Sequence, residues 1–365
     1  MSEVLERNSE TASRLRIIDS DIHPSMASER DLDPFLSARW RQHIAEYGKA
    51  SFRPFLSRGT YPRFTPNVAR RDAWPPNGQP PGSDLDFMRL QLLDRYDIET
   101  GILEPLVDAG LVRNLGLAQA LCSALNDWQV DAFVSRESRL RASILIPFED
   151  PAAAVAEIVR RAPDRAYAQI QLTSRSTEPI GRPKYWPIFE AAAHYGLPIG
   201  MHIGGEAGHA PSAGGWPSFY LEDHHGLIHS MQAQVTSMIL EGVFERFPNL
   251  KIICIEGGFA WAPTLAWRLD AHWRKMRAEV PEVKQPPSSY MRTNIWWSSQ
   301  PMEEPERPEE LRKVLDWMGW DRLLFASDYP HWDFDDPERA FPIRLSEAER
   351  RAVFRGNAEG VYKLS

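Results

Sequence analysis

The sequence predicts an α/β fold, a (β/α)8 barrel that carries an inserted lid segment. First, eight short apolar segments typical of strands recur along the 365 residues, and helical segments separate almost all of them. Strands that alternate with helices imply a parallel sheet, and eight such units imply a closed barrel. Second, ionisable residues follow several of these strands, at the ends where barrel enzymes place their active sites. Third, Asp-x-His-Pro follows the first strand, where a doubly wound open sheet would need a Gly-rich phosphate turn.

The order of elements follows from apolar periodicity and from helix start and stop signals. The expected strands cover residues 16–20, 100–104, 140–147, 167–172, 197–202, 250–255, 293–297 and 322–327. The expected helices cover residues 84–96, 117–134, 152–161, 185–195, 226–247, 263–276, 308–318 and 346–354.

Local signals fix several of these helix ends. Ser83 is the expected N-cap of helix 84–96. Asp150-Pro151 reads as an N-cap followed by proline in the first turn, and Gly196 is a stop signal. Ser346 with Glu349 three residues later forms a capping box that starts the last helix.

Two segments lie outside the repeating pattern. Residues 1–15 are polar and read as a loose N-terminal arm before the barrel of residues 16–365. Residues 25–83 are dense in Pro, Arg, Trp and Phe, with one short helix expected near residues 34–47. A long connection of this kind is usually functional. It fits a lid over a pocket, and it fits an interface with a partner equally well.

Composition excludes several classes of protein. A formal charge of −8 argues against binding of nucleic acid through its phosphates. The sequence contains no run of 18 apolar residues, so we expect no membrane span. The N-terminus lacks the apolar core of a signal peptide. Cys122 and Cys254 lie in apolar surroundings and read as buried free thiols of a reducing compartment. We therefore expect a cytoplasmic protein.

Five ionisable residues stand at the ends of four predicted strands. Asp21 and His23 follow the first strand, and residues i and i+2 of a strand point the same way. His202, Glu256 and Asp328 end the fifth, sixth and eighth strands. Such groups have a desolvation cost unless they are paired or bound to a metal. Any one of them alone reads as a solvated loop residue, but five at one face indicate a site.

Asp21, His23, His202 and Asp328 supply two nitrogen and two carboxylate ligands. This set suits a single Zn²⁺, and its oxygen content also allows Mn²⁺ or Fe²⁺. The cation would lower the pKa of a bound water toward about 7. Asp328 is the expected acceptor of that proton, and Glu256 is the expected second acid/base or substrate-contacting group.

Histidines at residues 224, 225 and 229 begin the helix that follows the fifth strand. His225 is the expected catalytic residue of this group, and capping of the helix is the alternative role. His331 follows Asp328 closely and is expected to orient it. Tryptophans 216, 296, 297 and 332 lie near strand ends and either pack in the core or wall a site for a flat substrate.

The chain resembles the amidohydrolase superfamily, in the branch that includes aminocarboxymuconate-semialdehyde decarboxylase and the benzoate-type decarboxylases. The resemblance covers residues 16–362 except the lid. The motifs that carry it occupy residues 18–23, 200–202, 242–258, 325–331 and 356–358. It implies a (β/α)8 barrel with one divalent metal, ligated at strand one by Asp21 and His23, at strand five by His202 and at strand eight by Asp328. The family often has His-x-His at strand one. Its decarboxylases carry His at strand six, where this chain has Glu256.

Three functions are compatible with these residues. The leading hypothesis is a metal-dependent hydrolase that activates water against an amide, lactone or C–C bond of a small carboxylated cyclic or aromatic substrate, and Glu256 favours it. Non-oxidative decarboxylation of an aromatic or muconate-type acid is the alternative. A non-catalytic binding barrel is the second alternative. A homodimer is expected, because most soluble oligomers are symmetric and dimers are the commonest.

Overall fold

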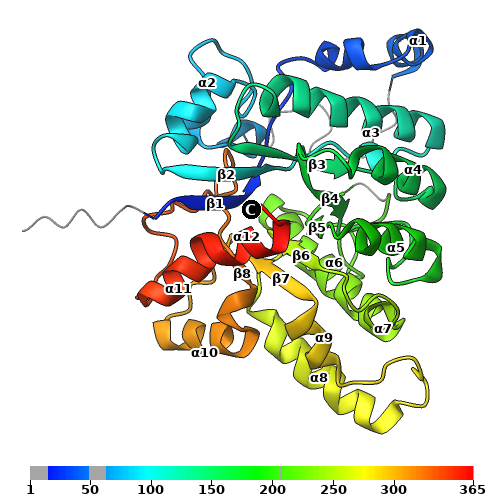
Figure 1. Cartoon of the computed structure of the whole chain (residues 1–365), viewed down its shortest axis with the longest axis vertical. Coiled ribbons are helices and arrows are strands. Elements are labelled where there is room, and N and C mark those ends of the chain that lie inside the picture. The colour runs from blue at the N-terminus through cyan, green and yellow to red at the C-terminus, as the bar shows by residue number, and fades with distance from the viewer. Residues whose placement is uncertain (1–14, 49–62, 206–207, 365) are drawn as a thin grey trace, which may run out of the picture.

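A computed structural model describes residues 15–48, 63–205 and 208–364. Eight parallel strands pair in the order of the chain, from β1 to β8. The Ile22–Tyr329 bridge and the hydrogen bond from Asp328 N–H to the Asp21 carbonyl (3.1 Å) join β8 back to β1. The sheet is therefore a nearly closed barrel with helices around it, and the (β/α)8 prediction is confirmed (Figure 1).

The strands are short, as barrel strands usually are. They are β1 (Ile17–Ile22), β2 (Ile98–Leu103), β3 (Leu140–Leu145), β4 (Tyr167–Thr173), β5 (Ile199–His202), β6 (Ile252–Ile255), β7 (Ile295–Ser298) and β8 (Leu323–Leu324).

The α-helices of the described residues cover the outside of the barrel and one of its ends. They are α1 (Ala38–Tyr47), α2 (Leu85–Met88), α3 (Leu115–Gln129), α4 (Pro151–Arg161), α5 (Trp186–Tyr195), α6 (Tyr220–Leu240), α7 (Val243–Arg246), α8 (Trp261–Met276), α9 (Pro287–Thr293), α10 (Pro308–Met318), α11 (Glu347–Arg351) and α12 (Asn357–Tyr362). Shorter 3₁₀ and π segments include η1 (Glu29–Phe35), η4 (Arg89–Leu93), η6 (Val130–Val134) and η9 (Ala352–Gly356).

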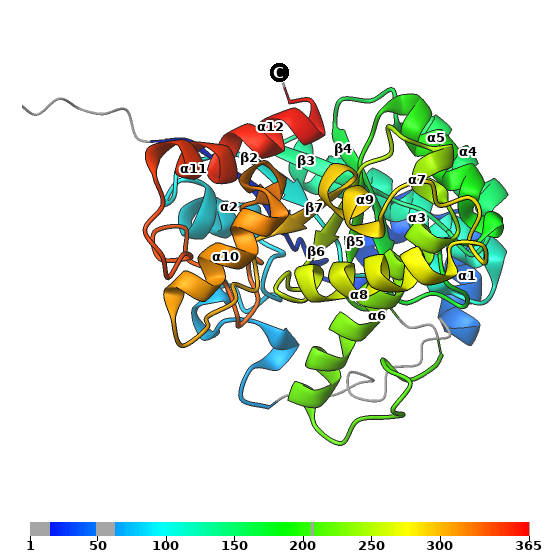
Figure 2. The ribbon, with the colours of Figure 1, turned by 90° about the horizontal axis from the view of Figure 1, so that it is seen from below.

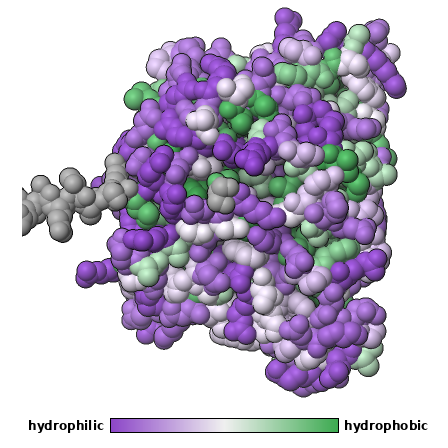
Figure 3. Space-filling model, in the orientation of Figure 1, coloured by the Kyte–Doolittle hydropathy of each residue, from purple (hydrophilic) through white to green (hydrophobic). Residues whose placement is uncertain are grey.

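Two apolar clusters hold the barrel together. The larger lies between the strands and the surrounding helices. The smaller lies inside the barrel, where Ile18, Ile102 and Ile253 meet Val361 and Tyr362 of α12. α12 therefore plugs one end of the barrel, and the first turns of α6 project from the opposite end (Figure 2). The face that carries α12 is mostly hydrophilic, with small hydrophobic areas (Figure 3).

Several predicted helix ends are confirmed. Asp150 accepts from Ala153 N–H, Gly196 ends α5 with φ of 66°, and Ser346 and Glu349 form the capping box. The cap of α2 was predicted wrongly, because Asp84 and not Ser83 accepts from Phe87 N–H.

The predicted helix 226–247 differs most from the structure. α6 begins six residues earlier, at Tyr220, and ends at Leu240. Gly242, with φ of 76°, then separates α6 from the short α7. This left-handed conformation suits glycine and interrupts a helix. The earlier start matters for the site, because the first two turns of α6 line the cavity described below.

The predicted arm of residues 1–15 lies outside the described residues except for Leu15. In the predicted lid of residues 25–83, residues 49–62 also lie outside them. Of the rest, η1 and α1 occupy the region of the single expected helix. The division into arm, barrel and lid stays a prediction.

Candidate active site

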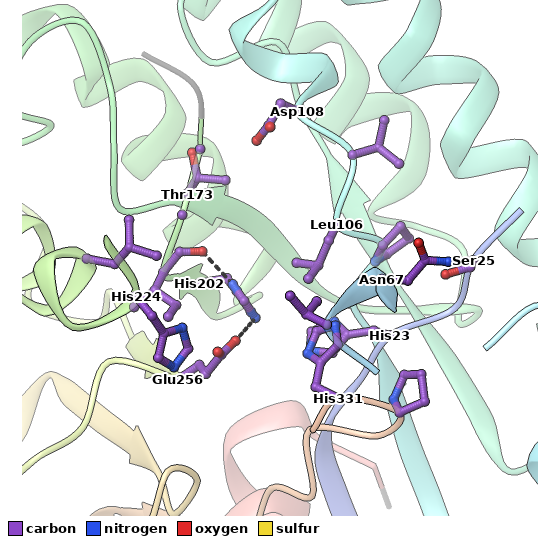
Figure 4. Close-up of a pocket in the computed structure, with 18 of the residues that line it drawn as sticks. His23, Ser25, Asn67, Leu106, Asp108, Thr173, His202, His224, Glu256 and His331 are labelled. Carbon is purple, nitrogen blue, oxygen red and sulfur yellow. Dashed lines mark hydrogen bonds and ion pairs between the residues drawn. The ribbon is translucent and has the colours of Figure 1, made fainter. Parts of the chain in front are cut away.

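A cavity of about 510 Å³ opens at the carboxyl ends of the strands. The loops after β1, β2, β4, β5, β6 and β8 and the start of α6 form its walls. His23, His202, Glu256 and His331 lie at its inner end (Figure 4). The cavity therefore occupies the place where barrel enzymes carry their chemistry.

Two histidines have a fixed orientation in this site. The Nδ1 atom of His23 lies 2.8 Å from the carbonyl of Glu104, and that of His202 lies 2.6 Å from the carbonyl of Ile203. A carbonyl oxygen only accepts, so both Nδ1 atoms donate. In a neutral ring this leaves Nε2 with a free lone pair, which is the state that a metal ligand needs.

The two aspartates converge on the same imidazoles. His23 Nε2 lies 3.1 Å from Asp21 Oδ1 and 2.8 Å from Asp328 Oδ1, and His202 Nε2 lies 3.9 Å from Asp21 Oδ2. Both oxygens of Asp21 and both Nε2 atoms are buried and lack a hydrogen-bond partner among the described residues. Buried polar atoms of this kind normally have partners, so they indicate a bound ligand between them.

These donors fit a divalent cation. Donor atoms of Asp21, His23, His202 and Glu256 all lie within 4.8 Å of one another, and so do those of His23, Glu256, Asp328 and His331. Imidazole nitrogen with carboxylate oxygen suits Zn²⁺ and Mn²⁺. Three of the predicted ligands, Asp21, His23 and His202, thus lie in the first group, and Asp328 lies in the second. The two groups share His23 and Glu256, and the second adds His331.

Asp328 is held firmly in this cluster. Its Oδ2 accepts from Gln300 (3.1 Å), and its Oδ1 lies 2.5 Å from His331 Nδ1. Burial, followed by the charges of Glu256, Asp333 and Asp21, raises the pKa of Asp328 well above its ordinary value. The predicted contact between His331 and Asp328 is present, and the His331 ring also stacks on His23 at 4.4 Å.

Asp328 and Glu256 each have a strained backbone conformation. Their φ angles are 59° and 55°, in the left-handed region that non-glycine residues rarely adopt. Such strain persists where surrounding structure enforces it, and it gathers at functional sites. Glu256 lines the cavity, and Asp328 is buried beside His23 and His331, which also line it.

Glu256 lines the cavity and contacts His202. Its Oε2 lies 2.9 Å from His202 Nε2. Burial lowers the pKa of His202, but the contacts with Glu256, Asp21 and Glu104 outweigh it and raise this pKa to about 10. The excess of carboxylates around one imidazole is the charge that a divalent cation would balance.

On α6 the structure places His224, and not the predicted His225, at the cavity. Tyr220, Asp223, His224 and Leu227 line it. They stand at positions i, i+3, i+4 and i+7, which form one helix face. His225 is exposed and contacts the ring of His229 at 5.9 Å. Successive helix residues point about 100° apart, so only one of the two neighbouring histidines faces inward.

Sequence reasoning missed other parts of the cavity. Arg175 stands two residues beyond β4, and Asp333 lies 3.5 Å from His224. The i, i+3, i+4, i+7 pattern at residues 220–227 was the available signal for the α6 wall. Of the four predicted tryptophans, Trp216 and Trp332 line the cavity and the other two do not.

The amidohydrolase family model matches residues 18–364. The chain belongs to the amidohydrolase family. Its relatives include γ-resorcylate decarboxylase from a Polaromonas species, 26% identical over 303 residues that cover 77% of this chain and 88% of the relative. They also include 2-amino-3-carboxymuconate-6-semialdehyde decarboxylase from Dictyostelium discoideum, 25% identical over 247 residues, with 67% of this chain and 66% of the relative covered.

Solved amidohydrolase structures share the fold. 2,6-Dihydroxybenzoate decarboxylase from Rhizobium has a TM-score of 0.68 at 20% identity, covering 96% of this chain and 99% of that one. 5-Carboxyvanillate decarboxylase from Novosphingobium aromaticivorans, complexed with manganese, has a TM-score of 0.71 at 19% identity, covering 100% and 99%. The predicted branch of the superfamily is confirmed, and so is an enzyme of the hydrolase or carboxy-lyase class.

Among the described residues no helix has the length and apolar character that crossing a bilayer requires. Both cysteines are buried and free, as predicted.

Proposed function

We propose that this amidohydrolase is a non-oxidative decarboxylase of a small aromatic or muconate-type acid, acting with one divalent cation. Asp21, His23, His202 and Asp328 would hold the cation, which is Mn²⁺ or Zn²⁺ by the chemistry of these ligands. When bound, it would stabilise the negative charge that develops on the substrate. The observation that carries the proposal is the buried Asp328, whose carboxyl group lies among the cation ligands beside the cavity.

Asp328 is the proton donor in this mechanism. Burial raises the pKa of Asp328, which is the direction that a general acid requires. It gives this proton to the ring carbon that bears the carboxylate. The bond between that carbon and the carboxylate then breaks, its electron pair returns to the ring, and CO₂ leaves.

The cavity supports a flat substrate. Its volume of about 510 Å³ is in the range of small-molecule sites. Trp128, Trp216, Tyr220 and Trp332 contribute aromatic walls, which suit a planar ring. The decarboxylase names of the relatives favour this reaction over the hydrolysis that Glu256 suggested from the sequence.

Hydrolysis is the second candidate, and one observation favours it. Glu256 places a carboxylate 2.9 Å from His202 Nε2, at the inner end of the cavity, where it could accept a proton from water. Glu256→His replaces the carboxylate with the imidazole that family decarboxylases carry at strand six. If the enzyme is a hydrolase, this substitution removes the base and lowers its rate.

The reactions differ in their products. Metal-loaded protein is incubated in H₂¹⁸O with aromatic and unsaturated carboxylic acids, and products are identified by mass. A decarboxylase releases CO₂ and yields a product that has lost 44 mass units and carries no ¹⁸O on its organic part. A product that incorporates one ¹⁸O without loss of CO₂ would establish hydrolysis instead.

Asp328→Asn tests the role of the proton donor. The amide keeps the size of the side chain but cannot supply the proton, so kcat should fall about 10³-fold or more. Metal content and thermal unfolding are measured beside it. A variant with wild-type metal content and wild-type kcat would contradict the assigned role.

A further inference from the structure

Arg175 presents a buried charge on the cavity wall. Its side chain lines the cavity, yet the residue is only 8% exposed. Arginine is almost never this buried unless it is paired. Arg175 has no part in the proposed metal site or in the roles proposed for Asp328 and Glu256.

The backbone fixes Arg175 above the metal cluster. Thr173 pairs with His202 across β4 and β5, and Arg175 N–H donates to the carbonyl of Gly204 at 3.1 Å. Arg175 thus stands two residues beyond the level of His202, about 7 Å outward along the strands. Figure 4 shows Thr173 on this wall, farther from Glu256 than His202 is.

The guanidinium group has few partners. One nitrogen, Nη2, donates to the carbonyl of His209, and Nε is buried with no hydrogen-bond partner among the described residues. Within the same residues no carboxylate lies within the 4.0 Å of an ion pair. A buried, incompletely bonded guanidinium is costly, so its retention indicates a ligand.

Two carboxylates lie near Arg175 without forming such a pair. Asp108 and Asp223 also line the cavity, and both are partly exposed. Burial lowers the pKa of Arg175, and the charges of Asp223 and Asp108 oppose this shift. They help to keep the guanidinium protonated. A ligand bonded directly to it interacts over a shorter distance and with less solvent screening than they do.

We propose that Arg175 binds a second carboxylate on the substrate, at the end of the molecule away from the carboxylate that is lost. A guanidinium matches a carboxylate with two parallel hydrogen bonds, which makes arginine the usual residue for this task. The substrate is then a dicarboxylic acid, with one acid group at the metal cluster and the other at Arg175. This inference rests on the proposed decarboxylase function for the position of the first carboxylate.

A matched set of probes tests the proposal by binding. The set consists of 2-hydroxybenzoates with a carboxylate, or the isosteric carboxamide, at ring position 4 or 5. Dissociation constants are measured calorimetrically on the full-length, metal-loaded protein. At one position or both, we expect the dicarboxylate to bind about 10-fold or more tightly than its carboxamide. In Arg175→Gln the two probes should bind about equally. In Arg175→Lys the dicarboxylate should keep part of its advantage, because the charge remains.

Two controls separate recognition from structure. Arg165 is exposed on the protein surface, so Arg165→Gln makes the same charge change and should keep the wild-type ratio. Arg175→Met should unfold at the wild-type temperature or above, because it removes a poorly paired buried charge. A large fall in its unfolding temperature, together with an unchanged binding ratio in Arg175→Gln, would assign Arg175 a structural role.

The outcomes also separate this inference from the proposed function. If wild-type protein binds carboxylate and carboxamide equally at both positions, the role of Arg175 is overturned. If the ratio and its loss in Arg175→Gln are observed but no probe or other acid releases CO₂, the Arg175 site stands and decarboxylation fails.

Discussion

At the scale of single residues, the site depends on which histidine nitrogens are already engaged in hydrogen bonds with the backbone. Carbonyl oxygens accept from the Nδ1 atoms of His23 and His202, so only Nε2 remains to face the carboxylates. That of His23 faces Asp21 and Asp328, and that of His202 faces Glu256 and Asp21. These carbonyls belong to Glu104 and Ile203, at or just after the ends of β2 and β5. The strand ends therefore both carry the proposed ligands and orient them.

His224 gives a residue-scale prediction with a matched control. Burial lowers its pKa, but Asp333 and Glu256 outweigh this effect and raise it, which favours the charged form of the ring beside the cavity. We propose that His224, and not His225, serves as a second acid/base group, so His224→Gln should lower kcat about 10²-fold. His225→Gln should leave kcat unchanged, since His225 is exposed. The comparison requires equal metal content in both variants.

The reverse result would restore the interpretation made from the sequence. Loss of activity in His225→Gln, with a fully active His224→Gln, would mean that the exposed histidine reaches the substrate in the working enzyme. Equal, wild-type rates in both would remove α6 histidines from the mechanism.

At the scale of elements, the sequence predicted positions better than orientations. Every predicted strand overlaps an observed one, because apolar segments bounded by helices have few alternatives. The eighth strand has two residues where the sequence predicted six. The face that α6 turns to the cavity depended on a start at Tyr220 that no cap signal marked.

Glu137 joins two elements through a paired charge. It accepts from Arg139 Nε (2.9 Å) and from Arg89 Nε (2.8 Å), so it links η4 to the loop before β3. Hydrogen bonds from Arg139, followed by those from Arg89, outweigh burial and lower its pKa from 4.5 to about 2.

The sign of the pH effect follows from this depressed pKa. The stabilisation is present above the unfolded-state pKa of 4.5 and is lost as the pH falls toward 2. Glu137→Gln should lower the free energy of unfolding by about 1–3 kcal/mol at pH 7 and by clearly less at pH 3.5. Urea unfolding at both values measures this. Glu279→Gln, at an exposed residue, is the control. An equal loss for Glu137→Gln at both pH values would contradict the ionic origin.

At the scale of the whole molecule, the barrel concentrates negative charge at one end. Asp21, Glu104, Glu256 and Asp328 come from four strands and lie buried around the same histidines. Burial raises the pKa of Asp21 and takes that of Glu104 to about 7, and repulsion from neighbouring carboxylates adds to both shifts. This arrangement costs stability unless a cation balances it.

Metal removal should therefore destabilise the fold. Dialysis against a chelator should lower the unfolding temperature by about 5 °C, and Mn²⁺ or Zn²⁺ should restore it, because a ligand that binds only the folded state stabilises it. Asp21→Asn provides the comparison, since added metal should raise the unfolding temperature of this variant less than that of the wild type. Identical melting with and without metal, in protein shown to contain none, would contradict the metal site.

The sequence by itself determined the barrel and the positions of the four residues proposed as metal ligands, because strand order and residue type at strand ends are local properties. Only the tertiary structure decided which neighbours complete the site. His224 in place of His225, Arg175 beside the cavity and His331 stacked on His23 depend on side-chain direction. That direction is set when strands distant in the chain close the barrel. A local pattern, such as the helical spacing of residues 220–227, shows which side chains share a face but not what that face meets.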